Sequence, residues 1–199
     1  MPRYCTSSRP TLPIAAALAL LAVATVAPPA ESQSRPYSRP APPSPIAVAD
    51  VVLTPAADWR VERPRSMMRK AQLAIPGDAG DGELVVFFFG TGQGGGVDAN
   101  VQRWLGQFQK ADGEVVEGER ETREIDGGKV TVVRAAGTYL SGMPMAAKTP
   151  KPGWALVGII VESPRGPVFV KLTGPEATLK EAEKGIARLI ESIAIGAPS

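Results

Sequence analysis

Apolar side chains occur in short runs from about residue 46 onward, and proline or glycine bounds most of these runs. The run at residues 84–89 contains no polar residue, so a strand at 83–89 is predicted to be central and covered on both faces. Charged residues dominate 119–125, which predicts an edge strand. Further strands are expected at 59–63, 68–75, 129–136, 154–161 and 168–172.

Two segments carry apolar residues at helical spacing. The first begins near Val97 and is expected to end at 111–113. The second follows Gly174, with Pro175 expected at the first helical position. The first predicted face contains Val97, Val101, Trp104, Leu105 and Phe108. The second predicted face contains Leu179, Ala182, Ile186, Leu189, Ile190 and Ile193.

The order of these elements predicts an α+β fold. Asp126, Gly127 and Gly128 are typical of a hairpin turn, and the other strands are also joined by short connections. We therefore expect a mainly antiparallel sheet covered by two helices, in a single domain at residues 56–196. A loop is expected at about 140–152.

The N-terminal region has the pattern of an export signal. Arg3 and Arg9 precede an apolar stretch at 12–27, and Ala22-Val23-Ala24 fits the cleavage rule better than Thr25-Val26-Ala27. We expect a signal peptide at 1–27 and a periplasmic or secreted protein, with an uncleaved anchor as the alternative. Residues 28–55 are proline-rich at their start and are predicted to be a disordered linker.

Charge and composition exclude several classes of function. The chain has 22 basic and 20 acidic residues, and removing residues 1–24 deletes two arginines and the only cysteine. The formally neutral remainder gives no general attraction for nucleic acid, and no membrane span is expected after cleavage. The chain has no histidine, which excludes Ser-His-Asp catalysis and the common zinc sites. We expect no cofactor, no metal and no enzymatic activity.

A glycine-rich segment is the sharpest motif in the chain. Residues 90–95 spell G-x-G-x-x-G between a predicted strand and a predicted helix. The antiparallel hairpins expected afterwards argue against a dinucleotide site, and so does Asp98 at the helix start, which would repel a phosphate. The segment is interpreted as a flexible turn, or as a contact loop for a partner or small anion. The residues of that contact loop would be Gly92, Gln93, Gly94, Gly95 and Gly96.

Carboxylates provide the remaining candidate chemistry. Their spacing singles out no acid–base pair of the kind that glycoside hydrolysis needs, so a carboxylate-based hydrolase is the weakest alternative. The candidates are Asp58, Glu62, Glu83, Asp98, Asp126 and Glu162.

The segments at 86–108 and 171–193, together with the strand–helix order, resemble secreted bacterial proteins of unknown function that are similar in layout to PsbP-like α/β/α sandwiches. The resemblance covers about residues 58–195 and involves no catalytic motif. It implies a non-catalytic accessory factor, by analogy of fold. The leading hypothesis is a binding protein that contacts another envelope protein. The alternative is a small-molecule or ion binder that uses the glycine-rich loop.

Overall fold

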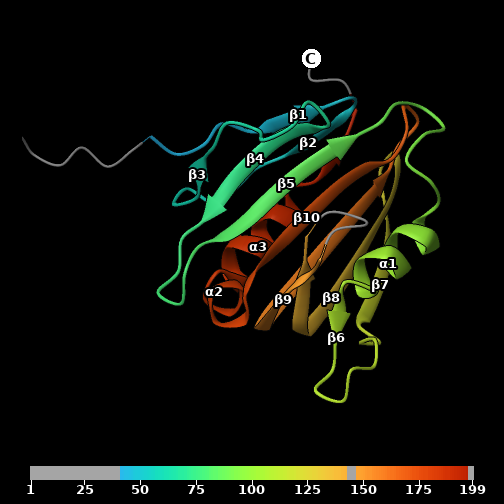
Figure 1. Ribbon diagram of the computed structural model, residues 1–199. Helices are drawn as coiled ribbons and strands as arrows, with labels where there is room; N and C mark the ends of the chain where they lie inside the picture. The colour runs from blue at the N-terminus through green and yellow to red at the C-terminus, as the bar shows by residue number, and fades with distance from the viewer. Residues whose placement is uncertain (1–40, 143–146, 197–199) are drawn as a thin grey trace, which may run out of the picture. The chain divides into compact units, whose positions relative to one another are not determined.

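The computed structural model describes residues 41–142 and 147–196. The expected signal peptide and the first part of the expected linker lie outside these residues. The larger of two sheets has eight strands, and all its strand pairs are antiparallel. Its order is β3 (Arg60–Val61), β4 (Arg69–Ile75), β5 (Gly82–Phe88), β10 (Val168–Pro175), β9 (Thr149–Glu162), β8 (Gly128–Ser141) and β6 (Phe108–Gln109), with β7 (Glu119–Ile125) also paired to β8 (Figure 1).

Three helices pack against this sheet within the described part of the chain: α1 (Val97–Leu105), α2 (Glu176–Glu181) and α3 (Glu183–Glu191). The helices α2 and α3 lie on one face, and α1 lies on part of the other (Figure 1). The predicted α+β class and mainly antiparallel sheet are confirmed. In the two described ranges, no helix is long and apolar enough to cross a lipid bilayer.

The face toward α2 and α3 holds the larger core. Alternation along β5 and β10 directs Leu84, Val170 and Leu172 to this side, and all three have no exposed surface. Ile186 and Leu189 of α3 complete the layer and are also fully buried. The predicted central position of the strand at 83–89 is confirmed, because β5 lies between β4 and β10.

The opposite face holds a smaller, aromatic core under α1. Trp104 packs edge-on against Phe169 of β10, with ring centroids 6.4 Å apart. Its indole lies directly over Gly158 of β9, where an added Cβ would be 2.4 Å from the ring. Only a residue without a side chain allows α1 to come this close to the sheet.

Both predicted helices are shorter than expected. The first ends at Leu105, because Gly106 closes the last turn by donating to Gln102 O, and Phe108 is a strand residue paired with Tyr139. The second is interrupted at Ala182, so the expected two helices are three. Leu179, Ile186 and Leu189 still pack into one core, which explains why the apolar pattern does not reveal the break. Pro175 is the N-cap rather than the first helical residue.

The hairpin of β8 and β9 is longer than predicted. It extends to Ser141 and resumes at Thr149, so the expected loop at 140–152 is wrong at both ends. The register shifts between Gly137 and Tyr139, and Gly137 has a φ of 156°. Antiparallel pairing with β8 within the hairpin maintains β9 here despite Pro150 and Pro152.

The expected linker at 28–55 is wrong for its last part. Residues of β1 (Ile46–Val48) and β2 (Val51–Leu53) form a second, three-stranded sheet with β11 (Ala194–Ile195). Val51 and Leu53 are fully buried in the larger core, so the folded region begins before residue 56. Ala49 adopts a φ of 56° in the turn between β1 and β2.

Candidate functional site

Lys171 is a charged residue in a central strand of the sheet. Val170 and Leu172 point into the larger core, so Lys171 points to the α1 side. Its backbone neighbours are Val85 of β5 and Gly158 of β9. This position leaves the side chain half-buried on a sheet face that α1 covers only in part.

Two polar contacts hold the Lys171 ammonium. It donates a hydrogen bond to Oε1 of Gln107, which follows α1. It also lies 5.3 Å from the centroid of the Tyr139 ring. Tyr139 stacks on Trp154 with centroids 5.6 Å apart, and Lys151 Nζ lies 4.1 Å from the Trp154 centroid. Aromatic faces favour cations, so these rings stabilise both ammonium groups.

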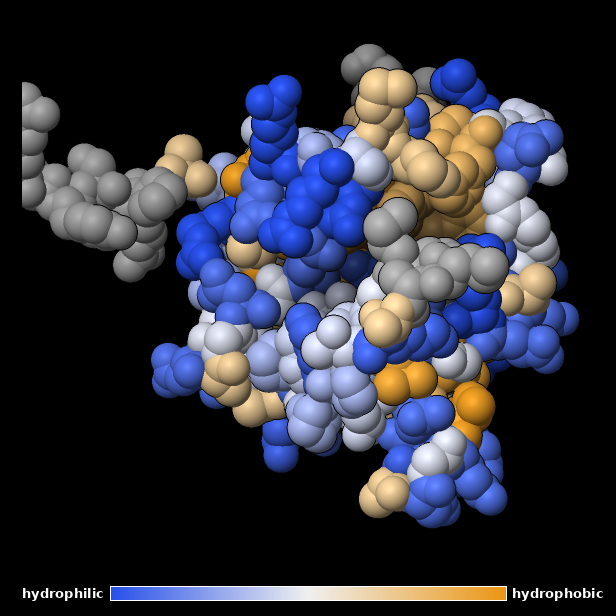
Figure 2. Space-filling view, viewed as in Figure 1, coloured by the Kyte–Doolittle hydropathy of each residue, from blue (hydrophilic) through white to orange (hydrophobic). Residues whose placement is uncertain are grey.

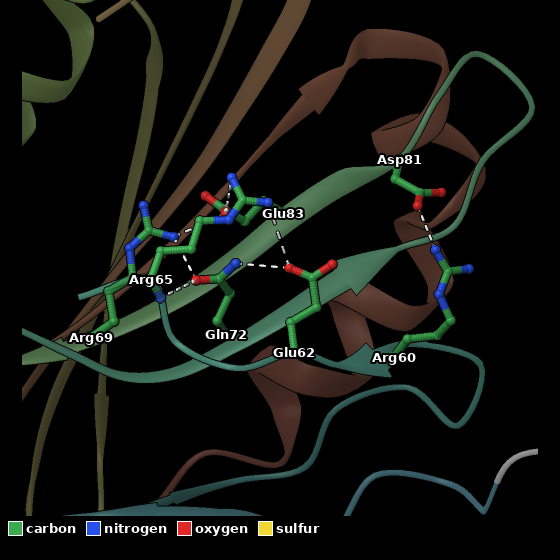
Figure 3. A network of polar contacts seen from close by, with 7 residues as sticks. All are labelled: Arg60, Glu62, Arg65, Arg69, Gln72, Asp81 and Glu83. Atoms are coloured by element: carbon green, nitrogen blue, oxygen red, sulfur yellow. Dashed lines mark hydrogen bonds and ion pairs between the residues drawn. The ribbon is translucent and has the colours of Figure 1, made fainter. Parts of the chain in front are cut away.

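A polar network on β4 and β5 borders this position (Figure 3). Gln72 is 1% exposed, and its amide donates to Glu62 Oε2 at 2.7 Å. Its Oε1 accepts from Arg69 Nη1 at 2.8 Å and from the Arg65 amide at 3.1 Å. Arg69 Nη1 also donates to Glu83 Oε1 at 2.9 Å. Each carboxylate of the network is therefore bound by nitrogen donors within the protein.

Electrostatics distinguish Lys171 from the other charged groups. Burial lowers the pKa of its ammonium from 10.5 to about 8, and the Glu83 carboxylate only partly opposes this. The guanidinium groups of Arg103 and Arg69 lower the pKa further. Burial also raises the pKa of the Tyr139 hydroxyl above 10.0, with a contribution from Glu83. Desolvation is therefore the main cause of both pKa shifts. We call this surface the Lys171 face; it comprises Arg69, Glu83, Gln107, Tyr139 and Lys171.

An apolar patch adjoins the Lys171 face at the end of β5. Met67 and Met68 lie in the turn that leads into β4, and they are 96% and 59% exposed. Phe89 is 37% exposed and stacks on Phe87, with centroids 6.2 Å apart. Because Arg69 pairs with Phe87, the turn lies beside these rings. Figure 2 shows apolar residues gathered at this end of β5, next to a broad polar region. We call Met67, Met68, Phe87 and Phe89 the Met–Phe patch.

The glycine-rich loop lies between β5 and α1. Asn100 Nδ2 donates to the carbonyl oxygens of Gly94 and Gly96, at 2.8 and 2.9 Å. Gly94 has a φ of 89°, and an added Cβ there would lie 2.7 Å from the Phe169 ring. These contacts give the loop a structural role as the entry to α1. Its predicted role as a contact loop, through Gly92, Gln93, Gly94, Gly95 and Gly96, stays a prediction.

A separate depression of about 650 Å³ opens beside α2. Leu156 and Leu179 contribute apolar surface to it. Arg134 is also in its wall and forms two hydrogen bonds with the Glu183 carboxylate, at 2.9 and 3.0 Å. The depression is on a different part of the sheet from the Lys171 face.

The predicted carboxylates are not brought together as an acid–base pair. Glu62 and Glu83 join the same network, but arginines and Gln72 occupy their oxygens. Asp98 pairs instead with Arg120 at 2.6 Å. Across residues 41–142 and 147–196, no group of three or more acidic, histidine or cysteine side chains could hold a metal ion.

Sequence reasoning missed Lys171, Arg69 and Gln72 as site residues. The signal was a polar residue inside an apolar strand pattern: Lys171 between Val170 and Leu172, and Gln72 next to Leu73. A charge in a central strand is costly unless it is compensated, so such a residue indicates a candidate site.

No known protein family matches the chain, and no curated protein sequence matches it at a significant level.

Proposed function

We propose that the protein is an exported, non-catalytic binding protein of the cell envelope that contacts another protein through the Met–Phe patch. The observation that carries this proposal is the exposure of Met67 and Met68 beside Phe89, at 96%, 59% and 37%. Met, Phe and Arg are enriched in protein interfaces relative to the rest of the surface. Isolated exposed apolar residues need no explanation, whereas a contiguous group of them marks an interaction site.

Charge near the patch defines the partner. Arg63 and Lys70 are exposed near the patch, while Arg65 and Arg69 are paired with carboxylates of the network. A partner surface with an apolar centre and acidic residues around it would complement the patch and its exposed basic residues. Electrostatic complementarity of this kind mainly sets specificity and the rate of association.

The export signal and the PsbP-like layout support the same proposal. The signal pattern at 1–27 directs the chain to the envelope. Helices lie on both faces of one antiparallel sheet. The resemblance to PsbP-like proteins, which mostly serve as accessory subunits, supports the proposal by analogy only.

The test is site-specific photo-crosslinking in the envelope of the host. A crosslinking amino acid at Met67 should trap one defined protein, and the Met68→Ser change should abolish that product. Val115 is 53% exposed in a different part of the fold, so a crosslinker there is the matched control. Equal crosslinking from positions 67 and 115, or a product unaffected by Met68→Ser, would refute the proposed contact surface.

A further inference from the structure

The Lys171 ammonium has no carboxylate partner among the residues that the structure describes. Glu83 is the acidic group that influences it most, yet Glu83 is engaged by Arg69 at 2.9 Å and Arg65 at 3.8 Å. Gln107 supplies a neutral acceptor only. A desolvated cation without a counter-ion is costly in a folded protein, and an anion bound beside it would remove that cost.

Positive charge exceeds negative charge around Lys171. The charges that act on its pKa are Arg69 of β4, Arg103 of α1 and Glu83 of β5. Tyr139 faces it from β8 and carries no charge at neutral pH, because its pKa is raised. The β9 neighbour is Gly158, which has no side chain. Two cations and one carboxylate therefore act on the Lys171 ammonium, and with its own charge the field at this position favours an anion.

Apolar surface lies next to the ammonium on the same face. The cross-strand pair Val85 and Lys171 is followed by the pair Phe87 and Phe169. Phe87 is half-buried and remains accessible, whereas Phe169 is only 2% exposed and is packed against Trp104. A ligand held at the ammonium would thus have the Phe87 ring beside it, which favours an apolar body attached to the anionic group.

We propose that the Lys171 face binds a small organic carboxylate, with its carboxylate on the Lys171 ammonium and its apolar body against Phe87. A monovalent carboxylate matches the single unpaired ammonium. Arg103 supports the negative charge from the α1 side. This site shares Phe87 with the Met–Phe patch, but the ammonium that recognises the carboxylate lies outside that patch, so the proposal does not depend on the protein partner.

The first experiment is a titration of the isotopically labelled full chain with benzoate and with hexanoate, followed by amide NMR. We expect saturable shifts centred on β5 and β10 and near Gln107. Benzyl alcohol and inorganic phosphate are the comparison probes, because each lacks one of the two features. Amide shifts with phosphate as large as those with benzoate would show that any anion binds. Amide shifts with benzyl alcohol of that size would show that apolar contact alone is sufficient. Either result would overturn the proposal.

Variants test the role of the ammonium itself. Lys171→Met should weaken benzoate binding at least about tenfold, which corresponds to one charge-assisted hydrogen bond. Lys171→Arg should retain binding, because it keeps the charge. Lys184→Met changes an exposed lysine of α3 and should leave binding unchanged. Undiminished binding by Lys171→Met with a native-like amide spectrum would refute the assignment.

The pH profile gives an independent readout. Only the protonated ammonium attracts the carboxylate, so affinity should be constant below pH 8 and then fall about tenfold per pH unit. Lys171→Arg should show no such fall, since arginine stays protonated. A wild-type profile that stays flat above pH 8 would contradict binding at Lys171, while crosslinking at Met67 would be unaffected.

Discussion

Replacing Lys171 by methionine should stabilise the protein at neutral pH. Methionine retains an unbranched, apolar side chain of similar length and removes the charge. The wild-type ammonium has a pKa of about 8 in the folded protein and of about 10.5 when unfolded. At about 1.4 kcal/mol per pH unit, this difference corresponds to a destabilisation of about 3 kcal/mol below pH 8.

The direction of the pH dependence follows from proton binding. Between pH 8 and 10.5 the unfolded chain binds more protons at this residue than the folded chain. The stability of the wild-type protein must therefore rise with pH across this window, relative to the variant. The advantage of Lys171→Met should be up to about 3 kcal/mol below pH 8 and should disappear toward pH 10.5. Loss of the Gln107 hydrogen bond and of the Tyr139 contact offsets part of that advantage.

Urea unfolding measures this difference directly. Tryptophan fluorescence reports on the fold, because Trp59 and Trp104 are 3% and 5% exposed. Wild type and Lys171→Met are compared at several pH values from about 6 to 10, and the other titrating groups cancel in the difference. Lys184→Met serves again as the control and should follow the wild type. A difference between wild type and Lys171→Met that is zero below pH 8, or constant across the window, would refute the reasoning about desolvation.

Three further changes test the packing of the fold. Gly158→Ala should lower the free energy of unfolding by about 1–3 kcal/mol, because the new Cβ would lie 2.4 Å from the Trp104 ring. An unchanged thermal melt would contradict the close approach of α1. Leu189→Asp should abolish cooperative unfolding, since Leu189 is fully buried in the larger core and the new charge would have no partner there. A wild-type transition in calorimetry would rule out this core position. Asp50→Ala should lower the free energy of unfolding by about 1–3 kcal/mol, because Asp50 is 8% exposed and accepts a hydrogen bond from Ser163 Oγ. An unshifted midpoint of urea unfolding would argue against that contact.

The sequence pattern predicted those strands that are marked by their own residues or by an adjacent turn. The apolar run at 84–89 corresponds to β5, and the Asp126-Gly127-Gly128 turn joins β7 to β8 as expected. The strands at 46–53 were missed because the prolines before them favour a linker. Their pairing with β11, at the other end of the chain, is what makes them part of the fold.

The Lys171 face could not be assembled from the sequence for a related reason. Gln107 and Lys171 are 64 residues apart, and neither belongs to a recognisable motif. Their contact depends on the end of α1 at Leu105 and on the antiparallel register of β10, and spacing along the chain indicates neither with sufficient accuracy. The alternation in β10 does indicate on which side Lys171 must lie.

The pairing of β5 with β10 determines when the protein can fold. Proteins are synthesised from the N-terminus, so the residues of β4 and β5 are complete before residues 168–175 of β10 have been made. Until then the apolar edge of β5 has no partner beyond β4, and such an edge can pair with other chains. Sheet closure between distant segments also makes folding slow, because a large loop must be ordered first. A chain that lacks the last thirty or so residues would therefore aggregate rather than fold, and the newly made protein needs protection until its C-terminal strand is complete.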